Sequence, residues 1–166
     1  MLLPDFSPWE LIERLNKAEV DFVVIGGIAA VVHGSPQFTK DLDVCYDTAD
    51  ENLKRLGAAL VALGARLRGV AEEVPFVPDG RTLRRTQVLT LDTPLGPFDV
   101  LASPSGFPGY AALAERAIHA EIRGVGFRIA SLEDLIAMKR AAGRPKDLIA
   151  VEELEAIQRI LREESA

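Results

Sequence analysis

Two aspartates separated by one residue, Asp41 and Asp43, are the side chains whose type and spacing best suit chemistry. They begin a run, Asp41–Tyr46, in which polar and apolar residues alternate with the period of a β-strand. Both carboxylates should therefore leave one face of the strand, with Cα atoms about 6.5–7 Å apart, while Leu42 and Val44 point into a core. Carboxylates fixed this close repel each other, and a divalent cation would relieve the repulsion.

Magnesium, or manganese in its place, is the expected ion, because it takes hard oxygen ligands and is commonly held by carboxylates together with substrate phosphates. Two such ions about 3.5–4 Å apart would activate an attacking oxygen and stabilise a leaving pyrophosphate. Asp99 is the best candidate for a third ligand, because Phe98 and Val100 bury one face of its strand and Asp99 projects from the other. This prediction requires the Asp99 strand to lie beside Asp41 and Asp43.

Two glycines, Gly26 and Gly27, stand between a buried apolar run at 20–25 and a short apolar segment at 28–32. The pattern predicts a strand, a tight turn and a brief helix, in that order. Glycines at such a junction let the backbone approach phosphates closely and direct amide groups at them. Each motif alone has a plainer explanation as a solvated strand edge or an ordinary turn, but their order along the chain favours a phosphate and metal site.

The remaining patterns predict a mixed α/β (α+β) fold, in which a central sheet is flanked by helices. Caps, prolines and glycines predict helices over about 8–17, 48–63, 110–116, 131–143 and 145–163. Strand patterns lie near 65–70, 86–91, 95–101, 118–123 and 127–130, with an irregular stretch before residue 86. The last helix carries a row of apolar residues at helical spacing: Leu148, Val151, Leu154, Ile157 and Leu161.

Length and composition predict a single domain, residues 1–166, with a core over about 20–130 and a C-terminal helical part over about 131–163. The lone cysteine, Cys45, excludes an intrachain disulfide, and two histidines without partner cysteines do not provide the ligand set of a closed tetrahedral zinc site. Neither a secretory signal nor an apolar run of about 18 residues is present, so we expect a cytoplasmic protein without a membrane partner. A net charge of −6 predicts no general attraction to nucleic acid.

The segment Val24-Ile25-Gly26-Gly27, followed by His33-Gly34, Thr39 and Asp41-Leu42-Asp43-Val44, resembles the signature of the nucleotidyltransferase superfamily that includes DNA polymerase beta. It is particularly similar to small bacterial members from toxin–antitoxin and abortive-infection systems. The C-terminal segments 131–139 and 143–148 share this similarity, which covers about 20–157.

The resemblance implies a nucleotidyltransferase fold and assigns roles to individual residues. Gly26 and Gly27 would contact the triphosphate, Asp41, Asp43 and Asp99 would bind magnesium, and Lys139 and Asp147 would line the cleft. Thr39 and Lys40 are grouped with the nucleotide-binding residues. Two positions depart from the family pattern: Gly27 stands where many relatives have serine, and Gln37 where they often have arginine, for which Lys40 is the nearest replacement cation.

These residues predict transfer of a nucleoside monophosphate from a nucleoside triphosphate to an acceptor hydroxyl, with Asp99 helping to deprotonate the acceptor. The acceptor could be a small molecule, a transfer RNA end or a protein side chain. The main alternative is a catalytically silent member of the fold that binds a partner, such as one half of a toxin–antitoxin pair, or a second copy of itself. A dinucleotide-binding oxidoreductase fits poorly, because Gly26–Ala30 lacks the Gly-x-Gly-x-x-Gly spacing.

Several basic residues have two explanations at this stage. Lys139 falls in the last turn of a predicted helix, where a cation is favourable against the helix dipole without any catalytic role. Arg81, Arg84 and Arg85 could bind a nucleic acid or a phosphate, but such a run is more often a solvated loop.

Overall fold

Four consecutive buried apolar residues, Phe22–Ile25, form β1 in the middle of the sheet. In the computed structural model, which describes residues 5–70 and 76–166, β1 lies between β2 (Leu42–Tyr46) and β7 (Val125–Ile129). Strand neighbours on both sides satisfy its backbone groups, and helices α2 (Gly26–His33) and α5 (Tyr110–Arg116) pack against it. This explains why the strand is a continuous apolar run instead of an alternating one.

Helices and strands are interleaved along the chain. The remaining strands are β3 (Arg66–Leu67), β4 (Val88–Thr93), β5 (Gly96–Leu101) and β6 (Ile118–Ile122). The remaining helices are α1 (Pro8–Lys17), α3 (Asp50–Ala62), α4 (Gly80–Arg85), α6 (Leu132–Ala142) and α7 (Pro145–Glu164). The prediction of a mixed α/β fold with helices around a central sheet and at the C-terminus is confirmed.

The sheet has the strand order β3-β4-β5-β2-β1-β7-β6. β2 runs parallel to β5 and β1 parallel to β7, whereas the other neighbours are antiparallel. The β2–β5 register pairs Leu42 with Phe98 and Asp43 with Asp99. Because side chains alternate along each strand, Leu42 and Phe98 enter the core while the two aspartates project together from the opposite face. The strand of Asp99 thus lies where the sequence interpretation required it.

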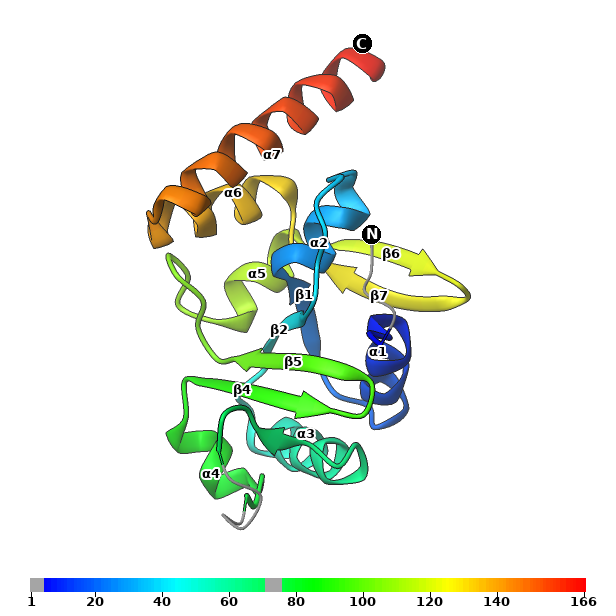
Figure 1. Cartoon of the computed structure of the whole chain (residues 1–166), viewed down its shortest axis with the longest axis vertical. Coiled ribbons are helices and arrows are strands. Elements are labelled where there is room, and N and C mark those ends of the chain that lie inside the picture. Colours follow the sequence, from blue (N-terminus) through cyan, green and yellow to red (C-terminus); the bar gives the residue numbers. More distant parts are fainter. Residues whose placement is uncertain (1–4, 71–75) are drawn as a thin grey trace.

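The two C-terminal helices lie at one end of the molecule, where α7 extends away from the sheet (Figure 1). α6 packs against both α7 and α2. Val151 and Leu154 of α7 are buried, whereas Leu148 and Leu161 of the same apolar row are 51% and 45% exposed. Because an α-helix has about 3.6 residues per turn, residues spaced three apart turn gradually away from one face of the helix. In addition, α7 is exposed from residue 159 onward. The apolar row therefore contacts the rest of the protein only in its middle. Within the described ranges, no helix is long and apolar enough to cross a bilayer.

The stretch before residue 86 contains a helix, α4, that the sequence patterns missed. Asp79 caps this helix by accepting a hydrogen bond from the Thr82 amide at 2.8 Å, and Leu83 is buried beneath it. A six-residue helix offers less than two turns of periodicity, which is too short for its apolar spacing to be recognised. Residues 71–75 of this stretch lie outside the described residues.

A buried asparagine braces the end of the sheet opposite the aspartates. Asn52 of α3 is 2% exposed and accepts a hydrogen bond from the Asp21 amide at 2.7 Å. Its side-chain amide donates to the carbonyls of Asp21 and Asp47, at 3.0 and 2.7 Å. Asp21 precedes β1 and Asp47 follows β2, so this one side chain fixes both strands to α3.

Replacing Asn52 with alanine should lower the free energy of unfolding by about 2–4 kcal/mol, because the Asp21 amide and the Asp47 carbonyl lose their bond to the Asn52 side chain, and the Asp21 carbonyl keeps only its bond to the Asp47 amide. The matched control is Asn16→Ala, which removes one exposed hydrogen bond to the Gly126 carbonyl and should cost less than about 1 kcal/mol. Urea unfolding of the two variants measures the difference. Equal losses would show that Asn52 is not a brace.

Candidate functional site

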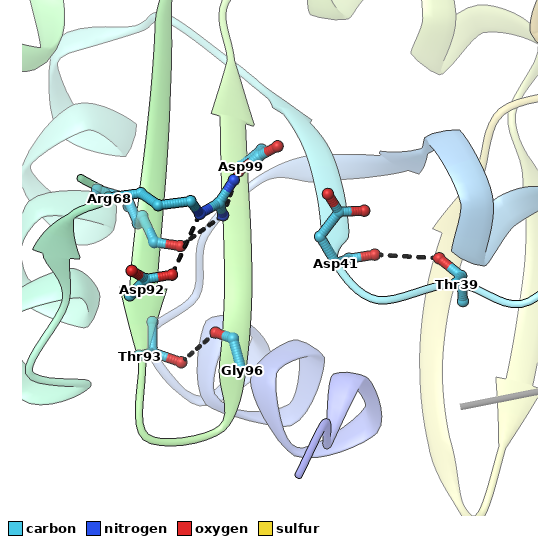
Figure 2. A network of polar contacts seen from close by, with 8 residues as sticks. Thr39, Asp41, Arg68, Asp92, Thr93, Gly96 and Asp99 are labelled. Atoms are coloured by element: carbon cyan, nitrogen blue, oxygen red, sulfur yellow. Dashed lines mark hydrogen bonds and ion pairs between the residues drawn. The ribbon is translucent and has the colours of Figure 1, made fainter. Parts of the chain in front are cut away.

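The three aspartates predicted from the sequence meet at one place. Asp43 and Asp99 are register partners on β2 and β5, and Asp41 lies just before β2 on the same face. One carboxylate oxygen from each residue lies within 4.8 Å of the other two, and all three side chains are partly buried. Figure 2 shows Asp41 and Asp99 on neighbouring segments of the same surface. The arrangement offers a cluster of hard oxygen atoms of the kind that magnesium prefers.

The charge of this cluster is unfavourable for the protein by itself. Burial raises the pKa of Asp43 well above its ordinary value, and repulsion from Asp41 and Asp99 raises it further. Burial and the charge of Asp99 also raise the pKa of Asp41. The neighbouring charges therefore disfavour ionisation of Asp41 and Asp43, and a bound divalent cation would remove this penalty. The donor set and its electrostatics fit a hard divalent ion.

The first glycine of the glycine pair has a steric reason to be glycine. Helix α2 begins at Gly26, whose φ is +67°, and a Cβ atom at this position would lie 2.1 Å from Oδ2 of Asp43. Only glycine tolerates both the left-handed backbone and the contact. The backbone at the start of α2 therefore touches the aspartate cluster directly.

Gly27 lies against Thr39, which is buried. A Cβ atom at Gly27 would lie 2.5 Å from Oγ1 of Thr39, and this hydroxyl is within 3.4 Å of the Asp41 carbonyl, to which it donates. Figure 2 shows the Thr39–Asp41 contact. The Thr39 hydroxyl therefore lies beside the start of α2, in the space that a side chain at position 27 would occupy. It places a hydroxyl group there although Gly27 has none.

A pocket of about 150 Å³ opens next to the two glycines, between α2, the segment 35–39 and the helices α6 and α7. Its lining is mostly apolar with a few polar groups, as is common for small-molecule sites. The lining residues are Gly26, Gly27, Ala30, Ser35, Gln37, Phe38, Thr39, Leu135, Lys139, Ala150, Glu153 and Leu154. The predicted residues Gly26, Gly27, Thr39 and Lys139 thus border one cavity that adjoins the aspartates.

Lys139 connects this pocket with the aspartate cluster. It lies in the last turn of α6, and its charge lowers the pKa values of both Asp41 and Asp43, which places it in their electrostatic neighbourhood. Lys40, which is exposed, also lowers the pKa of Asp41. Both predicted cations are therefore close enough to the cluster to act on an anion bound there.

Asp147 reaches the site only through Lys139. Its carboxylate is 1% exposed, lies 3.6 Å from Nζ of Lys139, and receives hydrogen bonds from the Arg144 side chain at 2.6 and 3.2 Å. Hydrogen bonding to Arg144 lowers the pKa of Asp147, so this carboxylate stays ionised at neutral pH. The structure thus gives Asp147 a positioning task at the start of α7, and direct nucleotide contact stays a prediction.

The site also contains a residue that the sequence interpretation missed. Nη2 of Arg68 lies 2.8 Å from Oδ1 of Asp99, and Nε lies 3.1 Å from Oδ1 of Asp92 (Figure 2). Arg68 follows the short strand β3, and nothing in its local sequence marks it as a partner of a residue 31 positions away. Only the pairing of β3, β4 and β5 brings it to the cluster.

Two other groups noted in the sequence are accounted for by structure. The basic residues Arg81, Arg84 and Arg85 lie on or at the end of α4, where Arg84 pairs with Asp50 at 2.7 Å on an exposed surface. Cys45 is fully buried, and burial raises the pKa of its thiol to about 12, so the thiol stays protonated. This agrees with a packing role for Cys45.

Comparison with known proteins identifies the fold. No protein-family model matches the sequence, and no curated protein is similar to it by sequence. A protein from Thermotoga maritima, named as a candidate nucleotidyltransferase, superposes with a TM-score of 0.52 and 17% identity over 93% of this chain and 89% of its own. The lincosamide antibiotic adenylyltransferase LnuA, solved with lincomycin, gives a TM-score of 0.61 and 16% identity over 92% of this chain and 99% of its own.

A third structure supports the same assignment. The antibiotic-resistance factor ANT(2'')-Ia superposes with a TM-score of 0.52 and 15% identity over 95% of this chain and 92% of its own. The chain therefore has the nucleotidyltransferase fold, as its sequence motifs predicted. Identities this low establish the fold, and the activity must be argued from the residues of the site.

Replacing Gly26 with alanine should disturb Asp43 as well as the backbone. The left-handed φ should cost about 1–2 kcal/mol of unfolding free energy, and the new Cβ should push the Asp43 carboxylate away from its neighbours and weaken Mg²⁺ binding. Gly64→Ala is a matched control, because Gly64 also has a φ of +67° but open space around its Cβ position. Urea unfolding should find a stability loss at least as large in Gly26→Ala as in Gly64→Ala, and Mg²⁺ calorimetry should find weaker binding only in Gly26→Ala.

The raised pKa of Asp43 gives a pH dependence with a definite sign. Because the folded state holds this proton more tightly than the unfolded state, the contribution to stability is complete at about pH 4 and below and is lost as the pH rises through the folded-state pKa. Without divalent cations, the wild-type chain should therefore lose stability relative to Asp43→Asn as the pH rises from about 4 to 8. Urea unfolding in EDTA measures this, and a pH-independent difference would contradict it.

Proposed function

We propose that this protein transfers a nucleoside monophosphate from a nucleoside triphosphate to an acceptor hydroxyl, with magnesium as cofactor and pyrophosphate as product. The observation that carries the proposal is the meeting of Asp41, Asp43 and Asp99 within 4.8 Å, directly against the glycine start of α2. The nucleotidyltransferase fold supports the same reaction class. The reaction needs a pool of nucleoside triphosphates, so a cytoplasmic location is part of the proposal.

The three carboxylates would divide the work at the metal site. Asp41 and Asp43 would hold the magnesium, and Asp99 would add one oxygen to it. Bound magnesium, or manganese, would neutralise charge on the phosphates and polarise the acceptor hydroxyl. Asp99 would also accept the proton of the acceptor, because its carboxylate belongs to the cluster beside which the acceptor hydroxyl must be placed for the reaction.

The phosphates would be held by the start of α2 and by neighbouring donors. The amide groups of Gly26 and Gly27 stand at the positive end of the α2 dipole, which favours an anion. The Thr39 hydroxyl lies beside them, and Lys139 and Lys40 supply positive charge from two sides. Phosphoryl chemistry depends mainly on such positioning and charge neutralisation, so these groups would carry the protein's part in the reaction.

The chemistry of the site indicates which nucleotide donor and which acceptor to assay first. The pocket beside Gly27 and Lys139 would take the nucleoside part of the donor. The acceptor must offer a hydroxyl to Asp99 and could belong to a small molecule, a transfer RNA end or a protein. LnuA is named as an adenylyltransferase of lincosamide antibiotics, so ATP with lincomycin is a reasonable first pair to assay.

A partner-binding protein without catalysis is the second candidate function, and α7 provides the observation in its favour. Four large apolar side chains of this helix are about half exposed or more: Leu148, Ile149, Ile160 and Leu161. A partner protein, such as the other half of a toxin–antitoxin pair, or a second copy of the chain could cover them. In that case the carboxylates would be expendable, so calorimetric titration with Mg²⁺ and nucleoside triphosphates separates the two candidates.

Asp43→Asn should abolish Mg²⁺-dependent nucleotide transfer and reduce Mg²⁺ affinity by at least about tenfold, because the central carboxylate of the cluster loses its charge. The assay incubates the protein with labelled nucleoside triphosphates, candidate acceptors and a cell extract, and follows label transfer and pyrophosphate release. Asp21→Asn, at the opposite end of β1, is the control and should behave as wild type. Unchanged transfer by Asp43→Asn on an identified acceptor would refute the assignment.

A further inference from the structure

Arg68 is held beside the aspartate cluster by several independent contacts. Its backbone amide donates to the Thr90 carbonyl at 2.9 Å, which fixes the residue against β4. Its guanidinium donates to the Leu91 carbonyl and to Oδ1 of Asp99, both at 2.8 Å, and to Oδ1 of Asp92 at 3.1 Å (Figure 2). Leu91 and Asp92 would hold the guanidinium in place even without Asp99. Arg68 is therefore a fixed cation at the edge of the cluster.

The contact engages one oxygen of the Asp99 carboxylate. Oδ1 accepts a hydrogen bond from Arg68, and one Asp99 oxygen lies within 4.8 Å of an oxygen of Asp41 and of Asp43. The Asp99 side chain is 16% exposed and that of Arg68 is 34% exposed, so water screens this ion pair less than an open surface pair. While Arg68 bonds to Oδ1, a metal ion that binds through both oxygens of Asp99 must compete with the guanidinium for Oδ1.

We propose that Arg68 limits Asp99 to one coordinating oxygen and thereby makes the aspartate site select Mg²⁺ over Ca²⁺. This inference rests on the proposed function, because it concerns the same cation site. Mg²⁺ requires octahedral geometry at about 2.0–2.1 Å and is satisfied with single oxygens and water. Ca²⁺ takes about 6–8 oxygens at about 2.3–2.6 Å and gains from carboxylates that bind through both oxygens. A carboxylate restricted to one oxygen penalises Ca²⁺ and leaves Mg²⁺ unaffected.

The charge of Arg68 has a second effect that must be separated from the first. A guanidinium next to the cluster repels every cation, so its removal should raise the affinity for Mg²⁺ and Ca²⁺ alike. The release of Oδ1 should raise the affinity for Ca²⁺ alone. The ratio of the two affinities therefore reports the restriction of Asp99, whereas their common change reports the charge.

The experiment is calorimetric titration of the full chain, without nucleotide, with MgCl₂ and separately with CaCl₂. Arg68→Ala should bind Ca²⁺ on the order of tenfold more tightly and Mg²⁺ only a few-fold more tightly, so that the affinity ratio shifts toward Ca²⁺. Arg68→Lys keeps the charge but lacks the planar fork that reaches Leu91, Asp92 and Asp99 together. It should leave Mg²⁺ affinity near wild type and still shift the ratio toward Ca²⁺.

Arg84→Ala is the matched control. Arg84 also forms an arginine–aspartate pair, with Asp50 at 2.7 Å, but on the exposed surface of α3 and α4, so both cation affinities should equal those of wild type. Urea unfolding in EDTA verifies that each variant is folded. If Arg68→Ala is not folded, Arg68→Lys decides by the same ratio.

Two different failures can be told apart. If the wild-type chain binds Mg²⁺ in a manner that depends on Asp43, but both Arg68 variants keep the wild-type affinity ratio, the selectivity role of Arg68 is wrong and the proposed function stands. If the wild-type chain binds neither cation and Asp43→Asn changes nothing, the metal site itself is wrong, and both proposals fall together.

Discussion

The mutual repulsion of three carboxylates is the constraint around which the site is built. Asp43 and Asp99 cannot move apart, because they belong to paired strands whose other faces, with Leu42, Val44, Phe98 and Val100, are buried in the core. The strain appears as the raised pKa values of Asp41 and Asp43. A chain with no use for such a cluster would gain stability by losing one of its charges. The core thus holds together a group of charges that only a cation can satisfy.

The neighbours of the cluster accommodate this charge from different sides. Gly26 leaves room for the Asp43 carboxylate, Lys139 approaches from the C-terminal helices, and Arg68 approaches from the edge of the sheet. Lys139 is in turn held by Asp147 at the start of α7, and α7 also contributes to the pocket beside α2. The C-terminal helices are therefore part of the site, although they lie outside the sheet that carries the aspartates.

The fold and the site contribute different kinds of information about function. The fold is shared with LnuA, named as a lincosamide antibiotic adenylyltransferase, and with the antibiotic-resistance factor ANT(2'')-Ia, at identities of about one residue in six. This fold places a pair of strands beside the start of a helix, and that arrangement could serve reactions with many different acceptor molecules. Beyond the cluster, this chain has a pocket lined in part by the exposed Phe38, and an Arg68–Asp92 pair at the edge of the sheet.

The sequence by itself determined the features that depend on local periodicity. The two-residue spacing put Asp41 and Asp43 on one face, the buried run before Gly26 marked the central strand, and proline, glycine and capping-residue patterns located most helices. Among the predicted caps in the described chain, however, only Ser131 accepts a side-chain hydrogen bond. Only the tertiary structure decided that β2 runs parallel to β5 with Asp43 opposite Asp99, and that Arg68 binds Asp99. These contacts join residues far apart in the chain, and their geometry follows from strand order and register, which are set by the packing of the whole core and leave no periodic signal in any one segment.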